Sequence, residues 1–207
     1  MRIGDYAQAN DGDTARVEAT VVWEDCDRPR RDVFFETAGE FADGLSCNPN
    51  AFLLATFIAA MRHGEKRVRV EGTICPQLRN GLHTAALQLR TWYGRDGLGP
   101  CAIEPTEGIA PAPLRPPRVG SFMSGGVDAM TTLRRNRLDF PLDHPGSIRD
   151  GILVHGLDLG GYVDKQNKKD HFNWVAKTLG AFADQADFTL LPVYTNVRHV
   201  TVHGMRP

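Results

Sequence analysis

A short apolar segment that ends in two adjacent glycines places the strongest constraint on the fold of this 207-residue chain. Residues 118–123 are mainly apolar, Ser124-Gly125-Gly126 follow, and a helical pattern begins at Asp128. This order predicts a buried strand, a glycine turn and the start of a helix. Adjacent glycines reach backbone angles closed to other residues, so successive amide N–H groups point into one concavity. Because the first turn of a helix adds unpaired N–H groups and a positive dipole end, the segment favours a phosphate or pyrophosphate group.

The carboxylate of Asp128 is unexpected in a plain anion site, because it repels phosphate unless it caps the helix or holds a magnesium ion. The run Ser124-Gly125-Gly126-Val127-Asp128 after an apolar strand resembles the PP-loop of the ATP pyrophosphatase superfamily, whose usual motif is Ser-Gly-Gly-x-Asp-Ser. Members of this superfamily split ATP between its α and β phosphates and form an adenylated substrate. The resemblance implies that these five residues bind ATP and Mg²⁺, with Asp128 as both a catalytic residue and the metal ligand.

One position departs from the PP-loop motif. Ala129 stands where the second serine is usual, which removes a hydroxyl donor to pyrophosphate. Thr131 and Thr132 lie near this position but do not occupy it. A Walker A loop does not fit, since no Gly-Lys-Ser/Thr follows the glycines.

The composition predicts a globular cytoplasmic protein. The chain is 42% hydrophobic, and its net charge of −1 gives no reason to expect nucleic acid as a partner. The start lacks the apolar region of a signal peptide, and the longest apolar stretch is far shorter than the ~20 residues of a membrane span. The four cysteines lack metal-ligand spacing and are interpreted as free buried thiols, at positions Cys26, Cys47, Cys75 and Cys101.

Residues 1–107 are predicted to form a small α+β domain, whose role the sequence does not declare. Its first 14 residues are polar, and we expect them to be loosely held. Hydrophobic periodicity then predicts strands over 15–23, 32–36 and 66–72 and helices over 51–62 and 76–93. Four prolines within residues 108–117 predict a semi-rigid linker at a domain boundary.

Residues 118–207 are predicted to form a β-α-β-α-β unit, part of a doubly wound parallel sheet of the Rossmann-like class. The expected strands cover 118–123, 151–159 and 188–196, and the expected helices cover 128–137 and 168–179. Gly180 is expected to end the second helix, and Pro192 suggests an edge position or an irregularity in the third strand. The predicted fold class is therefore α/β, with an α+β domain followed by an incomplete PP-loop domain.

In doubly wound sheets, ligands bind beyond the carboxyl ends of the strands, so the three strand ends are expected to form one site. The PP-loop resemblance implies that the end of the second strand receives adenine, which assigns Gly156, Leu157 and Asp158 to nucleotide binding. At the third strand we expect Arg198 to neutralise phosphate as a catalytic residue. Thr195 and Asn196 are expected to serve as donors there. His155 is either a packed strand-end histidine or a catalytic residue.

PP-loop domains ordinarily continue with two more strands, which do not follow residue 207, so we expect a C-terminally truncated domain. Its last strand would then leave an exposed edge, which favours a homodimer or a partner chain that completes the sheet. Two functions remain open. The first is an AMP-forming ligase or amidotransferase-like enzyme that adenylates an unidentified small molecule or peptide. The second is a non-catalytic nucleotide-binding module that acts with a partner protein.

Overall fold

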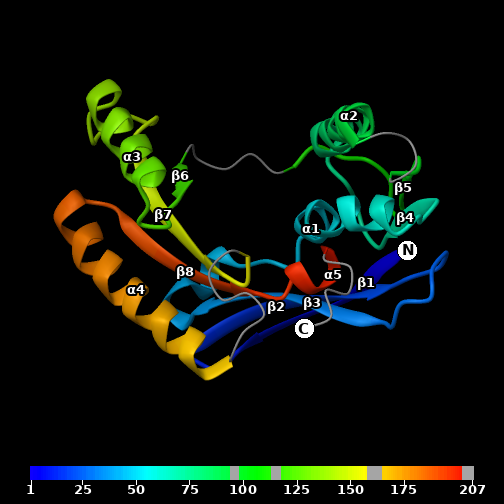
Figure 1. The fold of residues 1–207 in the computed structure, drawn as a ribbon, viewed down its shortest axis with the longest axis horizontal. Helices are drawn as coiled ribbons and strands as arrows, with labels where there is room; N and C mark the ends of the chain where they lie inside the picture. Colours follow the sequence, from blue (N-terminus) through cyan, green and yellow to red (C-terminus); the bar gives the residue numbers. More distant parts are fainter. Residues whose placement is uncertain (94–97, 113–117, 158–164, 202–207) are drawn as a thin grey trace.

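The computed structural model describes residues 1–93, 98–112, 118–157 and 165–201. The fold is α/β and is built on one mixed sheet of eight strands, in the order β5-β4-β1-β2-β3-β8-β7-β6 (Figure 1). The strands are β1 (Arg2–Asn10), β2 (Thr14–Val22), β3 (Arg31–Ala38), β4 (Arg67–Val70), β5 (Ala102–Pro105), β6 (Val119–Phe122), β7 (Ile148–His155) and β8 (Thr189–Thr195). The helices are α1 (Pro49–Arg62), α2 (Pro76–Tyr93), α3 (Val127–Asp139), α4 (Lys165–Ala186) and α5 (Arg198–Thr201), with a 3₁₀ helix at Gly39–Gly44.

The first half of the sheet confirms most of the predicted elements. β2 and β3 form the expected antiparallel hairpin, and β4, α1 and α2 lie where periodicity placed them. The expectation that residues 1–14 are loosely held is wrong, because β1 pairs with both β2 and β4. The side chains of Met1 and Ile3 are fully buried. β5, which pairs with β4, was not predicted.

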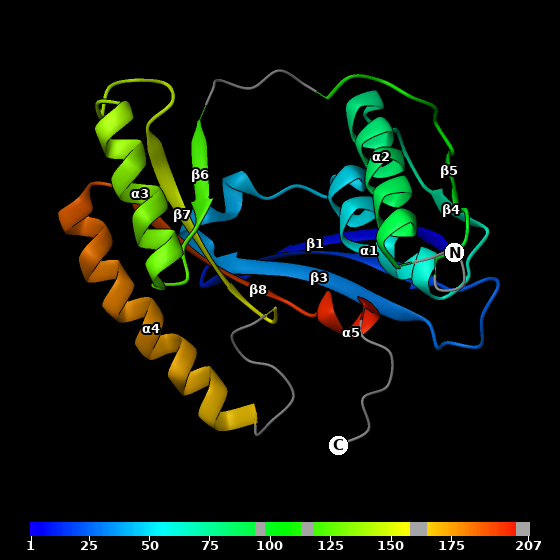
Figure 2. The ribbon, with the colours of Figure 1, turned by 45° about the horizontal axis from the view of Figure 1, so that its top comes forward.

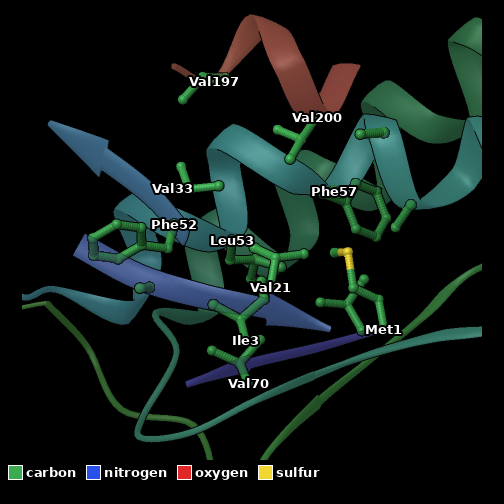
Figure 3. Close-up of a cluster of buried hydrophobic side chains, with 14 of the residues drawn as sticks. Met1, Ile3, Val21, Val33, Phe52, Leu53, Phe57, Val70, Val197 and Val200 are labelled. Atoms are coloured by element: carbon green, nitrogen blue, oxygen red, sulfur yellow. The ribbon is translucent and has the colours of Figure 1, made fainter. Parts of the chain in front are cut away.

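A large apolar cluster fills the space between this half of the sheet and α1. Phe52, Leu53 and Phe57 of α1 are 0% exposed and pack over the strands. Val197 and Val200, at the end of the described chain, belong to the same cluster and lie beside α1 (Figure 3). The core of the first half is therefore completed by residues of the second half.

The second half confirms the predicted β-α-β-α-β unit. β6, β7 and β8 are parallel neighbours, joined by α3 and α4. The expected stop at Gly180 is wrong, since α4 continues through it to Ala186. The extra turns bury Ala183 in a second apolar cluster, which also contains Leu179 and Phe188, and this packing stabilises the helix beyond the glycine. In the described part of the chain, no helix is both long and apolar enough to cross a membrane.

The two clusters lie on opposite faces of the sheet. Phe35 packs against the first cluster and is paired with Thr195, whereas the adjacent Tyr194 packs against the second. Successive residues of a strand point to opposite faces, so α1 and α4 cover different sides of the sheet (Figure 1). Phe122 is paired with Ile152 on the face away from α4, and its side chain is 70% exposed.

β8 is an interior strand, which corrects the expectation of an exposed edge. It pairs antiparallel with β3 over Val193–Thr195. Pro192 lies just outside this short ladder, where its carbonyl accepts a hydrogen bond from the Thr37 hydroxyl at 2.7 Å. One sheet thus joins the two predicted domains (Figure 2), and 113–117 of the predicted linker lie outside the described residues. The outer strands are β5 and β6.

Candidate functional site

The glycine turn lies between the end of β6 and the start of α3. Gly125 has a φ of +78°, in the left-handed region that favours glycine. Gly126 is the N-cap of α3, and no side chain caps the helix. The N–H of Gly126 donates to the Ser124 hydroxyl over a long 3.4 Å. Because residues 124–128 are all exposed, the first N–H groups of α3 face solvent and are open to an anion.

Asp128 lies in the first turn of α3, where the exposed carboxylate does not cap the helix. Among the described residues, no group of three or more His, Cys, Asp or Glu side chains could hold a metal ion. Magnesium commonly takes only one or two carboxylates and completes its octahedron with phosphate and water oxygens. A carboxylate beside a turn with exposed backbone donors fits that way of holding Mg²⁺. Ala129 packs against the second cluster, so the position of the motif's second serine contributes to the core here.

A pocket of about 190 Å³ lies beside the turn, at the carboxyl ends of β6 and β7. Its lining is mostly apolar and consists of Phe122, Met123, Ser124, Ile152, Leu153, Val154 and Leu157. Pockets for whole drug-sized ligands measure about 300–1,000 Å³, so this one suits a single ring system. Of these residues, Ser124 and Leu157 were predicted as site residues. The strand residues were missed, although their alternation along β6 and β7 placed Phe122, Ile152 and Val154 on one face.

Gly156, the residue after β7, lies in close contact with Thr195, the last residue of β8. Gly156 has a φ of +106°, and a Cβ added there would lie 1.9 Å from the carbonyl oxygen of Thr195. Only glycine fits this contact, which fixes the backbone directly before Leu157, a residue that lines the pocket. Leu157 follows and is 40% exposed. Asp158, assigned to nucleotide binding from the sequence, lies outside the described residues.

His155 points away from the pocket, toward α4. Its ring contacts Phe172 edge-on at a centroid distance of 5.1 Å and Tyr194 at 5.5 Å. Burial, with the nearby charge of Glu36 as a second cause, raises the pKa of Tyr194 above its ordinary value. These contacts support the packed strand-end interpretation of His155.

The side chains of Thr195 and Asn196 bind the backbone of β3. The Thr195 hydroxyl donates to the carbonyl of Phe34 at 2.7 Å and accepts from the N–H of Val197 at 3.2 Å. The Asn196 amide accepts from the N–H of Phe34 at 3.1 Å and donates to the carbonyl of Asp32 at 2.8 Å. Asn196 therefore extends the β3–β8 ladder through its side chain. Both side chains therefore already have hydrogen-bond partners within the fold.

Arg198 opens α5 and links the ends of β8 and β7. Its guanidinium donates to the carbonyl of Leu157. Parallel pairing turns the carboxyl ends of β6, β7 and β8 toward one edge of the sheet. β6 ends opposite Ile152, before the end of β7, and the contacts at Gly156 and Arg198 join the ends of β7 and β8. Comparison of the chain with protein-family models, curated proteins and solved structures gave no match.

Proposed function

We propose that this protein binds ATP at the carboxyl ends of β6 and β7, as the PP-loop part of a doubly wound unit. One observation supports the proposal above the others. An exposed glycine turn opens an uncapped helix directly beside an apolar pocket. The turn offers backbone donors to an anion, and the pocket offers apolar contact to a ring. A nucleotide combines these two chemistries in one molecule.

The phosphates would bind at the start of α3. Ser124 and the amides of Gly125, Gly126 and Val127 supply neutral donors, and the helix dipole favours negative charge there. Asp128 would hold Mg²⁺ against the phosphate oxygens. The ion's role is to neutralise charge on the phosphates as it develops.

The adenine ring would occupy the pocket between Phe122 and Leu157. Both side chains are partly exposed at its lining, at 70% and 40%. Covering them with a ring removes apolar area from water, which favours binding. The backbone at Gly156 and Leu157 lies at the same end of the sheet and would meet the edge of the base.

For the reaction, we propose adenylation by an AMP-forming ligase. An oxygen of an unidentified small-molecule or peptide substrate would attack the α phosphorus of ATP, and pyrophosphate would leave with the electron pair of the broken P–O bond. The second candidate is a nucleotide-binding module that acts with a partner protein and does not turn over. Ala129 favours this candidate, because it takes the place of a hydroxyl donor to pyrophosphate. Release of pyrophosphate separates the two.

Calorimetric titration with Mg²⁺ and ATP, with pyrophosphate assayed on the same sample, tests the proposal. Gly126→Val narrows the turn at a residue whose φ of −75° and ψ of 166° suit valine, and Asp128→Ala removes the carboxylate. We expect each to weaken ATP binding by at least about tenfold, which corresponds to 1.4 kcal/mol. Asp139→Ala is the matched control, because it removes an exposed carboxylate at the far end of the same helix. Wild-type affinity in both site variants would contradict the proposal.

A further inference from the structure

Arg198 was expected to bind phosphate, and in the structure it contacts the protein backbone. The guanidinium donates to the carbonyl of Leu157, which lines the apolar pocket. This carbonyl belongs to Gly156–Leu157, the two residues that directly follow β7 and are here called the β7 tip. A hydrogen bond from a charged donor is stronger than one between neutral groups, so this contact restrains the tip.

The helix that carries Arg198 is firmly anchored. Val197, just before α5, and Val200, within it, are 8% and 1% exposed in the first apolar cluster (Figure 3). Arg28, in the turn after β2, donates to the carbonyl of His199 at 3.4 Å. Since α5 is held by the core of the first half, the guanidinium extends from a fixed point toward the β7 tip.

A second contact restrains the tip from the same side. The backbone of Gly156 lies so close to the Thr195 carbonyl that no side chain fits between them. Thr195 is itself bonded to β3 through its hydroxyl. The wall of the pocket at Leu157 is thus held by β8, α5 and, through them, β3.

We propose that Arg198 is a positioning residue, which fixes the β7 tip against the base of the nucleotide and does not bind its phosphates. This inference rests on the proposed function. It assigns base recognition to a wall of the pocket that the first half of the chain holds in place. The phosphate chemistry remains with the turn at the start of α3.

Two ligands separate base contact from phosphate contact. Adenosine carries the base without phosphate, and tripolyphosphate with Mg²⁺ carries the phosphates without a base. In Arg198→Ala we expect adenosine and ATP to bind about tenfold more weakly, because one charge-assisted hydrogen bond is lost. Tripolyphosphate should bind within about twofold of its wild-type affinity. Arg198→Lys keeps a positively charged donor group and should recover part of the adenosine affinity. Arg135→Ala, which removes an exposed charge from α3, should bind all three ligands as wild type does.

A phosphate-binding role predicts the opposite result, in which tripolyphosphate binding falls and adenosine binding does not. That outcome would overturn the inference. Amide hydrogen exchange of residues 152–157 without ligand adds a readout that does not depend on the proposed function. We expect faster exchange in Arg198→Ala than in Arg135→Ala, and equal exchange would also overturn it. If the wild-type chain binds none of the three ligands, the proposed function fails, and hydrogen exchange alone decides whether Arg198 holds the β7 tip.

Discussion

Replacing Glu65 by glutamine is expected to remove about 3 kcal/mol from the free energy of unfolding, because it removes one charge of a buried ion pair. Glu65 is 1% exposed and accepts an ion-paired hydrogen bond from the N-terminal ammonium of Met1, which is fully buried. Its carboxylate also accepts the backbone N–H groups of Glu24 and Asp25, at 3.0–3.2 Å. The substitution keeps the shape of the side chain, so the loss comes from charge and hydrogen bonding.

The magnitude follows from what remains around the ammonium. Breaking a buried pair by removing one partner costs about 3–5 kcal/mol. Here the ammonium keeps a second carboxylate, Glu24, at 3.2 Å and the carbonyl of Arg67 at 2.8 Å, which places the loss at the lower end. For a chain of this length, about 3 kcal/mol lowers the midpoint of thermal unfolding by about 6–12 °C.

Urea unfolding followed by circular dichroism measures the change, provided that the slope with denaturant stays constant. The matched control is Glu104→Gln, since Glu104 is 48% exposed and pairs with Arg67 at the surface at 3.2 Å. Exposed ion pairs contribute little to stability, so the free energy of unfolding of this variant should be close to that of wild type. A loss below about 1 kcal/mol in Glu65→Gln, or one equal to that of the control, would refute the reasoning.

Three further changes test separate parts of the structure. Gly156→Ala forces a Cβ against the backbone of β8 at a φ of +106°, so it should lower stability by more than about 2 kcal/mol in urea unfolding; unchanged stability would contradict the contact. Gly180→Ala adds a Cβ in open space among the described residues, and because alanine favours a helix more than glycine does, it should raise the free energy of unfolding by up to about 1 kcal/mol. A lower free energy of unfolding would show that the helix is interrupted there. Cys75 has its pKa lowered chiefly by the backbone N–H of Leu78, whereas burial raises the pKa of Cys101 to about 11. Brief treatment with iodoacetamide at about pH 8 should therefore alkylate Cys75 before Cys101, because Cys75 carries the larger thiolate fraction. Mass spectrometry of the peptides measures the order, and earlier alkylation of Cys101 would contradict the prediction.

Local patterns were sufficient to predict most of the helices and strands. Alternation over residues 15–23 predicted β2, and apolar spacing over 51–62 predicted α1. β1 was missed because its outer half is polar and exposed, and only its first residues, including Ile3, are buried. Its place in the sheet depends on β2 and β4 on either side, which no local pattern reports. Gly180 was misjudged for a similar reason, since packing of the later turns of α4 outweighs the weak helix propensity of one glycine.

The sequence by itself determined the glycine turn at Ser124–Gly126 and the parallel order of the strands around it, because both depend on neighbouring residues and on short connections. Only the tertiary structure decided that β3 pairs with β8 and that Asn196 bonds to Phe34, 162 residues away in the chain. It also decided that Arg198 faces the carbonyl of Leu157. Contacts of this kind are fixed by the packing of whole layers, so the sequence suggested phosphate binding for the arginine and the asparagine but could not indicate their hydrogen bonds to the backbone.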